Sequence, residues 1–255
     1  MKIKTDIHTH TNHTQHAYST LWENAACAAK KGIELIAMTN HGPASHCHLE
    51  RDHFKYPPFT VPRRLNELGI TILRGAETNV LDDMGNLDLD NEILGNLDLV
   101  IASCHEKPYS PKTDKSFMRM YENLANNPQV DILGHICRNM PQDENCLDEV
   151  IELANKKGKL IEINQLSYIS RKQHRVDASK ILIRKLFEHK SLVVVNTDAH
   201  FCTLVGKFGP ITEHLEQMGY PEELIINRDQ KTLLEWLNRR ENRRQISLDE
   251  GLVSE

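Results

Sequence analysis

The chain has 255 residues, of which 39% are hydrophobic and 26% charged, and its formal net charge is −5. This composition is typical of a globular protein with a well-buried core and excludes a disordered chain. The acidic balance argues against a general nucleic-acid-binding surface, which is normally basic. No apolar run reaches the length of a membrane span, and the first six residues are too few and too polar for a secretion signal.

Cysteine and histidine usage narrows the class further. The six cysteines have neither CxxC spacing nor the density of a disulfide scaffold, so we expect a reducing, cytoplasmic location. The 14 histidines are unusually many, and four of them lie among the first sixteen residues. This concentration raises the possibility of a metal site.

Short apolar runs predict seven buried strands. In chain order they lie at residues 4–10, 34–40, 70–79, 98–106, 130–135, 159–165 and 191–200. Two of the intervening segments have clear helical periodicity: residues 19–32, with Ser19 as N-cap and Gly32 as stop, and residues 146–158, which end at Gly158. Buried strands that alternate with amphipathic helices predict an α/β fold whose parallel sheet is closed into a barrel or covered on both faces.

The rest of the chain predicts one domain with a small excursion. Residues 79–90 have the pattern of a β-hairpin after the third strand, with Met84, Gly85 and Asn86 near its turn. No linker, repeat or low-complexity tract divides the sequence, so we expect one barrel domain over residues 1–240. The polar tail, residues 241–255, is expected to fray.

Ligand-type side chains recur where these strands end. Six of the seven strands contribute them, and the set comprises His8, His10, His16, His41, Glu77, His105, His135, Asp198 and His200. In a parallel barrel the carboxyl ends of all strands share one face, on which active sites are built. Residues two apart in a strand point the same way, so His8 with His10, and Asp198 with His200, can act as neighbouring ligands.

A structural role is the alternative for each residue taken alone. A histidine at a strand end is more often a hydrogen-bonded structural residue than a metal ligand. Six strands that each place such a residue at the same end favour a shared cavity instead. His13 has no strand partner and is expected to be solvated, whereas His46, His48 and His53 follow the second strand and are expected at the rim at most.

The donor types constrain the metal. Mixed imidazole and carboxylate ligands suit zinc, manganese or iron, and the absence of clustered cysteines argues against a structural zinc finger or an iron–sulfur site. Catalytic metals use about three protein ligands each, so nine ligand-type groups predict three divalent ions.

Seven motifs carry a family resemblance. DIHTHT, HAYSTL, TNHGP, LRGAETN, ASCHE, ILGH and NTDAH, in this order, resemble the PHP (polymerase and histidinol phosphatase) superfamily over essentially the whole chain. HAYSTL and the pattern RGxExN resemble its YcdX-type branch of stand-alone phosphatases. The resemblance implies a distorted seven-stranded (β/α)7 barrel that holds three metal ions and hydrolyses phosphate esters. It also implies three ligand sets: His8, His10, Glu77 and Asp198; Glu77, His105 and His135; and His16, His41 and His200.

Two positions depart from the family pattern. Asn40 stands where the family usually has Asp, a residue expected to hydrogen-bond a ligand histidine rather than to bind metal. An amide raises imidazole basicity less than a carboxylate does, so the third site is expected to be weakened. After His135 the chain reads Ile-Cys-Arg where the family tends to have Pro-Gly, and Arg138 is therefore a candidate cation for the substrate.

The expected chemistry is hydrolysis of a phosphate monoester. Two metals bridged by Glu77 would hold a hydroxide between them, and the third, held by neutral histidines, would keep its charge for phosphate oxygens. A metal-bound water, Asp198 or His200 would protonate the leaving group. Arg171 and Lys172, after the sixth strand, are candidates for a phosphate clamp, although surface cations are commonly only solvated.

Several other functions compete with this interpretation. Histidinol-phosphate phosphatase is the nearest rival among enzymes, and an exonuclease fits the acidic charge less well. An amidohydrolase would need eight strands and commonly a carbamylated lysine, for which no lysine stands at a suitable strand end. Outside enzymes, a metal-binding regulatory protein with little turnover remains the alternative.

Overall fold

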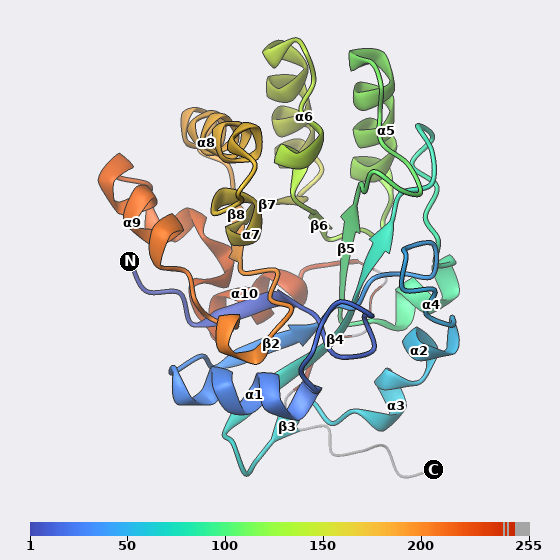
Figure 1. Cartoon of the computed structure of the whole chain (residues 1–255), viewed down its shortest axis with the longest axis vertical. Coiled ribbons are helices and arrows are strands. Elements are labelled where there is room, and N and C mark those ends of the chain that lie inside the picture. Colours follow the sequence, from blue (N-terminus) through green and yellow to red (C-terminus); the bar gives the residue numbers. More distant parts are fainter. Residues whose placement is uncertain (242, 244, 248–255) are drawn as a thin grey trace.

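Seven parallel strands follow one another around a nearly closed barrel in the computed structural model, which describes residues 1–241, 243 and 245–247 (Figure 1). Their bounds are β1 Thr5–Thr9, β2 Leu35–Met38, β4 Ile70–Asn79, β5 Leu99–Ser103, β6 Ile132–Leu133, β7 Leu160–Asn164 and β8 Val193–Asn196. A bridge between Thr9 and Ala199 joins the two ends of the sheet. Each predicted strand range contains one of these strands, and the distorted seven-stranded barrel is confirmed.

Alternation along the strands divides the barrel interior into two layers. Leu73 on β4 and Leu160 on β7 belong to an apolar cluster inside the barrel, near the strand starts. Four residues after Leu73, the same face of β4 carries Glu77, and two residues after Leu160, the same face of β7 carries Glu162. The apolar layer therefore lies beneath a layer of polar side chains at the carboxyl end.

Helices pack around the outside of the barrel (Figure 1). They are α1 Leu21–Lys30, α2 Asp52–Lys55, α3 Pro57–Thr60, α4 Asn91–Asn96, α5 Asp114–Asn126, α6 Glu144–Lys156, α7 Gln165–Tyr168, α8 Gln173–Glu188, α9 Gly209–Met218 and α10 Gln230–Leu237. Four 3-10 turns accompany them: η1 Ile136–Asn139, η2 Cys202–Leu204, η3 Glu222–Leu224 and η4 Ile226–Arg228.

The predicted stop of α1 is confirmed, but its predicted cap is wrong by one residue. Gly32 follows the helix with a φ of 75°, as a stop signal requires. Thr20, not Ser19, caps the helix: its hydroxyl accepts from the Glu23 amide at 3.2 Å, and the Glu23 carboxylate accepts from the Thr20 amide at 2.7 Å. The Ser19 hydroxyl instead accepts from the Cys202 amide at 2.9 Å, which ties α1 to the segment after β8.

The amino-terminal end of the barrel is closed by the last part of the chain. Leu233 and Leu237 of α10 and Ile226 of η4 join the apolar cluster inside the barrel. The backbone amide of Lys4 donates to the Arg228 carbonyl at 2.9 Å, and the Thr5 hydroxyl donates to the Asn227 carbonyl at 2.7 Å. The barrel is therefore open at its carboxyl end and plugged at the other.

Two smaller features complete the fold. The excursion after β4 returns through an antiparallel bridge between Val80 and Leu87, and the short β3 (Arg64–Leu65) pairs antiparallel with the start of β4. Of the predicted tail, residues 242, 244 and 248–255 lie outside the described residues, whereas Arg243 and Ile246 are buried against the domain. Within the described part of the chain, no helix is both long and apolar enough to cross a membrane.

Candidate metal centre

Glu77, near the end of β4, is the centre of the polar layer. Its side chain is fully buried, and five imidazoles surround its two carboxylate oxygens. Oε1 lies 2.8 Å from His135 Nε2, 3.3 Å from His105 Nε2 and 3.4 Å from His8 Nε2, while Oε2 lies 2.5 Å from His41 Nδ1 and 3.5 Å from His10 Nε2. The carboxyl ends of β1, β2, β4, β5 and β6 therefore meet at one carboxylate, as the strand pattern predicts.

Asp198 provides a second buried carboxylate beside the first. Its Oδ1 lies 3.1 Å from His10 Nε2, 3.6 Å from His8 Nε2 and 3.6 Å from His200 Nδ1. Its backbone adopts a φ of 55°, an uncommon value for a residue other than glycine, and such values cluster at functional sites.

The outer part of the site consists of stacked imidazoles. The His200 ring lies 4.2 Å from the His10 ring and 4.7 Å from the His16 ring, and the His16 ring lies 5.3 Å from the His41 ring. The backbone carbonyl of Asp198 lies 2.9 Å from His200 Nδ1 and orients the ring. All nine predicted ligands thus gather in one region, with His16 at its exposed edge.

Buried polar atoms that make no hydrogen bond indicate which kind of ligand the site can hold. Among the described residues, buried donor or acceptor atoms without a hydrogen bond include His8 Nε2, His10 Nδ1, His105 Nε2, His135 Nδ1 and His200 Nε2. Leaving a buried polar atom unsatisfied is costly, so such a convergence is expected where an ion supplies the missing partner. Nitrogen and carboxylate oxygen are the donors that zinc, manganese and iron accept, and the residues present therefore fit divalent metal ions.

The electrostatics prepare most of these groups to bind a cation. Burial, together with His41 and His200, holds the pKa of His10 well below its usual range, and burial lowers the pKa of His16 and of His135 to about 4. Burial alone would raise the pKa of Glu77, but His41, His8 and His105 outweigh it, and the pKa lies well below the usual value. Neutral imidazoles and ionised carboxylates are the forms in which these side chains bind metal.

The tightest groupings differ in part from the sets that the family resemblance implies. His8, His10 and Asp198 form one group of mutually close donors, in agreement with the first implied set. His41, however, groups with Glu77 and His105, and again with His10 and His200. His41 therefore lies between the implied second and third sites rather than in the third alone.

Glu162 is a buried carboxylate beside the site that the sequence pattern did not reveal. This carboxylate on β7 is fully buried and lies 2.7 Å from His8 Nδ1, on the side of the ring opposite Glu77. It also accepts from the His135 amide at 2.9 Å and from Asn196 at 2.9 Å. Its signal in the sequence is a charged residue within the apolar run 159–165, two residues before the last residue of β7 rather than at the strand end.

The expected role of Asn40 is wrong. Its Oδ1 accepts from the Thr11 amide at 2.8 Å and from the Thr14 hydroxyl at 3.2 Å, and its Nδ2 lies 2.9 Å from His53 Nε2. These contacts fix the loop between His10 and His16, and no hydrogen bond joins Asn40 to a ligand histidine in the described structure. The reason is geometric, because the Asn40 side chain points away from the cavity that its neighbour His41 lines.

An open cavity of 630 Å³ lies over the site, and five of the nine residues line it: His16, His41, His105, Asp198 and His200. Its wall includes Arg138 and Arg171, and also His46, as expected of a rim residue. Arg138 donates to Asp198 Oδ2 at 2.6 Å and to the Ser167 hydroxyl at 2.8 Å, so its guanidinium is fixed beside the site. Lys172, by contrast, lines a neighbouring cavity. His13 is exposed, as expected. His53, which was expected at the rim, instead has its ring 4.7 Å from the His13 ring.

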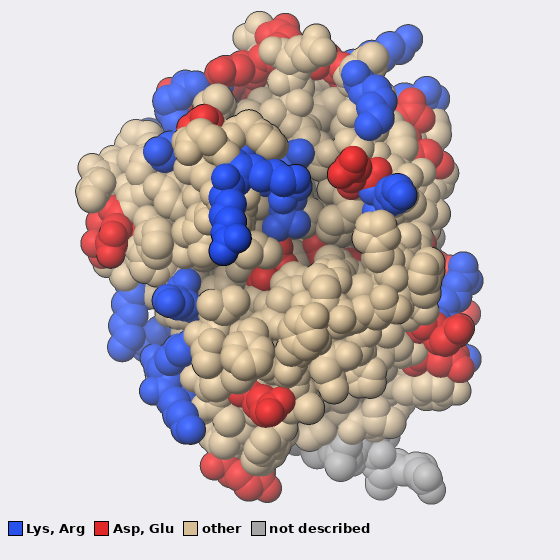
Figure 2. All heavy atoms as spheres, viewed as in Figure 1, with Lys and Arg blue, Asp and Glu red and all other residues tan. Residues whose placement is uncertain are grey.

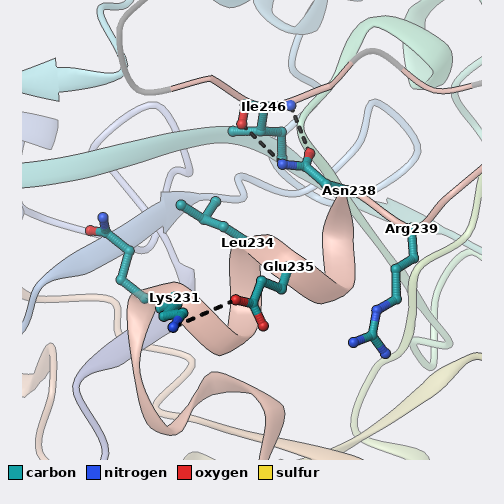
Figure 3. A pocket seen from close by; sticks show the side chains of 7 residues that line it. Lys231, Leu234, Glu235, Asn238, Arg239 and Ile246 are labelled. Carbon is teal, nitrogen blue, oxygen red and sulfur yellow. Dashed lines mark hydrogen bonds and ion pairs between the residues drawn. The ribbon is translucent and has the colours of Figure 1, made fainter.

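A separate hollow lies at the plugged end of the barrel, beside α10. Leu234, Glu235, Asn238 and Ile246 are among the residues that line it (Figure 3). The Glu235 carboxylate lies 4.0 Å from Lys231 Nζ, one turn earlier on the same helix. This hollow offers no converging set of ligand-type side chains among its described lining residues.

The chain is similar in sequence to a known protein family and in fold to a solved structure that contains zinc. Residues 6–166 match the PHP domain family. The chain is 36% identical over 249 residues to a probable phosphatase of Clostridium novyi, across 98% of this chain and 100% of that protein. It is 36% identical over 252 residues to a probable phosphatase of Thermoanaerobacter pseudethanolicus, with the same two coverages. Among solved structures, histidinol phosphate phosphatase from Lactococcus lactis, in complex with zinc, L-histidinol and phosphate, has a TM-score of 0.53 at 18% identity, over 87% of this chain and 93% of that chain.

Proposed function

The chain belongs to the PHP family and is a phosphatase, and we propose that it hydrolyses small phosphate monoesters at a centre of three divalent metal ions. The proposed ligands are His8, His10, His16, His41, Glu77, His105, His135, Asp198 and His200. The observation that carries the proposal is the set of buried, unpartnered nitrogen atoms around Glu77. Zinc, manganese and iron all match this donor set.

When bound, such ions supply fixed positive charge for phosphate oxygens and lower the pKa of an attacking water toward about 7. The protein's own groups orient and balance that charge. Glu77 lies among five imidazoles from four strands, and together with them it would hold the ions. Asp198 and His200 stand at the cavity wall, where either can transfer a proton to the leaving oxygen.

Arg138 is the protein cation nearest this chemistry. Its guanidinium is fixed by Asp198 and Ser167 and lines the cavity, so it is positioned to contact a phosphate oxygen without reorganisation. Arg171 lines the same cavity from the segment between α7 and α8 and is proposed as a second substrate contact. The place of action that we propose is a reducing cytoplasm, because the six cysteines have neither CxxC spacing nor the density of a disulfide scaffold.

The test compares Glu77→Gln with His13→Gln. Loss of the bridging carboxylate should reduce bound metal, measured by elemental analysis, and should remove most release of phosphate from p-nitrophenyl phosphate. His13→Gln is the control because His13 is an exposed imidazole in the loop after β1 and is not one of the nine proposed ligands. Wild-type protein that binds one ion or none after reconstitution would contradict the three-ion proposal, and equal effects of the two substitutions would contradict the role of Glu77.

A further inference from the structure

A second cavity, of 350 Å³, adjoins the one over the metal centre. His105, Glu106, Arg138 and Arg175 line both, so the two hollows share a wall. The second cavity lies between the loop that follows β5 and the segment that leads into α8. A molecule whose phosphate reaches the metal centre can therefore extend its other end into this space.

The walls of the two cavities are strongly cationic. They carry five basic side chains that make no ion pair or side-chain hydrogen bond in the described structure: Lys107, Lys112, Arg171, Lys172 and Arg175. Glu106 is the one carboxylate among the described lining residues of the second cavity. The chain as a whole has a net charge of −5, so this accumulation of positive charge is local. Figure 2 shows Lys and Arg side chains gathered at the edge of the central hollow, in the region of α7 and α8.

The segments that carry these cations are held in place. The Ser110 hydroxyl donates to the Asn139 side chain at 2.8 Å, and Asn139 in turn donates to the Cys104 carbonyl at 2.9 Å, which fixes the loop that bears Lys112. On the opposite wall, α8 begins at Gln173 with no acidic residue in its first turn. The partial positive charge of this 16-residue helix therefore adds to the charge of Lys172 and Arg175.

We propose that the second cavity binds a second anionic group of the substrate, a phosphate or a carboxylate carried by the leaving alcohol. This proposal rests on the proposed function, because it assumes that a phosphate ester reacts at the neighbouring metal centre. Five unpaired cations around one concave space attract an anion more strongly than a single surface cation does. The same charges disfavour a substrate whose leaving group is a cation, such as an amino alcohol phosphate.

The experiment compares substrate pairs that differ by one anionic group. Fructose 1,6-bisphosphate against fructose 6-phosphate tests a second phosphate, and 3-phosphoglycerate against glycerol 3-phosphate tests a carboxylate. In at least one pair, we expect kcat/KM for the more anionic substrate to exceed that for its partner by about tenfold. We expect kcat/KM for histidinol phosphate to be lower than for either member of that pair. Arg175→Gln and Lys172→Gln should reduce that preference several-fold, and added salt should reduce it as well.

Lys180→Gln is the matched control, because it removes one positive charge from an exposed position later on α8. Normal turnover of p-nitrophenyl phosphate without a preference in either pair would overturn the inference, as would a preference that survives both cavity substitutions. Binding of the same pairs to chelated protein, measured by calorimetry, needs no turnover. A preference retained in binding while all turnover is absent would contradict the proposed function alone.

Discussion

Single residues around the metal centre show which parts of the site a sequence can reveal. The ligand-type residues were predictable because each follows a buried apolar run, and strand ends converge in a parallel barrel. The role of Glu162 was not predictable, since it depends on β7 lying next but one to β1 in the closed barrel, which brings together residues 154 positions apart. The predicted contact of Asn40 with a ligand histidine was wrong for a related reason. Asn40 and His41 are neighbours in sequence, but their side chains face different surroundings.

Glu162→Gln tests the importance of the carboxylate behind His8. An amide offers one oxygen where the carboxylate offers two, so it cannot accept from both the His8 ring and the His135 amide. Changes of this kind behind a metal ligand typically cost about 10–100-fold in metal affinity or activity, and we expect a loss in that range from metal titrations and initial rates. Glu149→Gln, on the exposed side of α6, should leave both unchanged. Wild-type affinity in Glu162→Gln would mean that His8 is oriented by other contacts.

At the scale of elements, the pattern of apolar runs predicted every barrel strand but not how the barrel closes. Closure depends on specific polar contacts, such as Asn196 Oδ1, which accepts from the Ile7 amide at 3.2 Å where β8 and β1 meet. The pairing of β1 with β2 also shifts register between Asp6 and Thr9. No residue pattern in the sequence marks such irregularities. The sequence therefore predicts the number of barrel strands more reliably than it predicts how the barrel closes.

The start of β5 depends on one buried carboxylate, Asp98, which accepts from Arg74 at 2.6 Å and from Arg63 at 2.8 Å. Burial alone would raise the pKa of Asp98, but these two guanidinium groups outweigh it and the pKa is lowered. The stabilisation is therefore present above the unfolded pKa of about 4 and is lost as the pH falls through the lower folded value.

We accordingly expect Asp98→Asn to lower the free energy of unfolding by about 3–5 kcal/mol at pH 7, because two buried guanidinium groups lose an ion pair with this carboxylate. The difference between wild type and variant should shrink as the pH is lowered below about 4. Urea unfolding at several pH values measures both effects. A difference that stays constant with pH would show that Asp98 acts through packing rather than through its charge.

For the whole molecule, bound metal should contribute to stability as well as to chemistry. Ions that bind the folded chain and not the unfolded one add about 2.7 kcal/mol at a concentration of 100 times Kd, and each kcal/mol raises Tm by about 2–4 °C for a chain of this size. We expect a chelator to lower Tm by about 5–10 °C and re-addition of zinc or manganese to restore it. An unchanged Tm in protein verified to be metal-free would argue against ions bound among the buried imidazoles.

The plug at the amino-terminal end of the barrel has a consequence for biosynthesis. A ribosome delivers β1 first and α10 last, yet Lys4 and Thr5 make backbone and side-chain hydrogen bonds to Arg228 and Asn227. The apolar floor of the barrel therefore stays exposed on the nascent chain until α10 (Gln230–Leu237) has been made, and contacts so distant in sequence form slowly. Translation that stops before α10 should yield a polypeptide that depends on chaperones and is readily degraded, although every proposed metal ligand is already present in it.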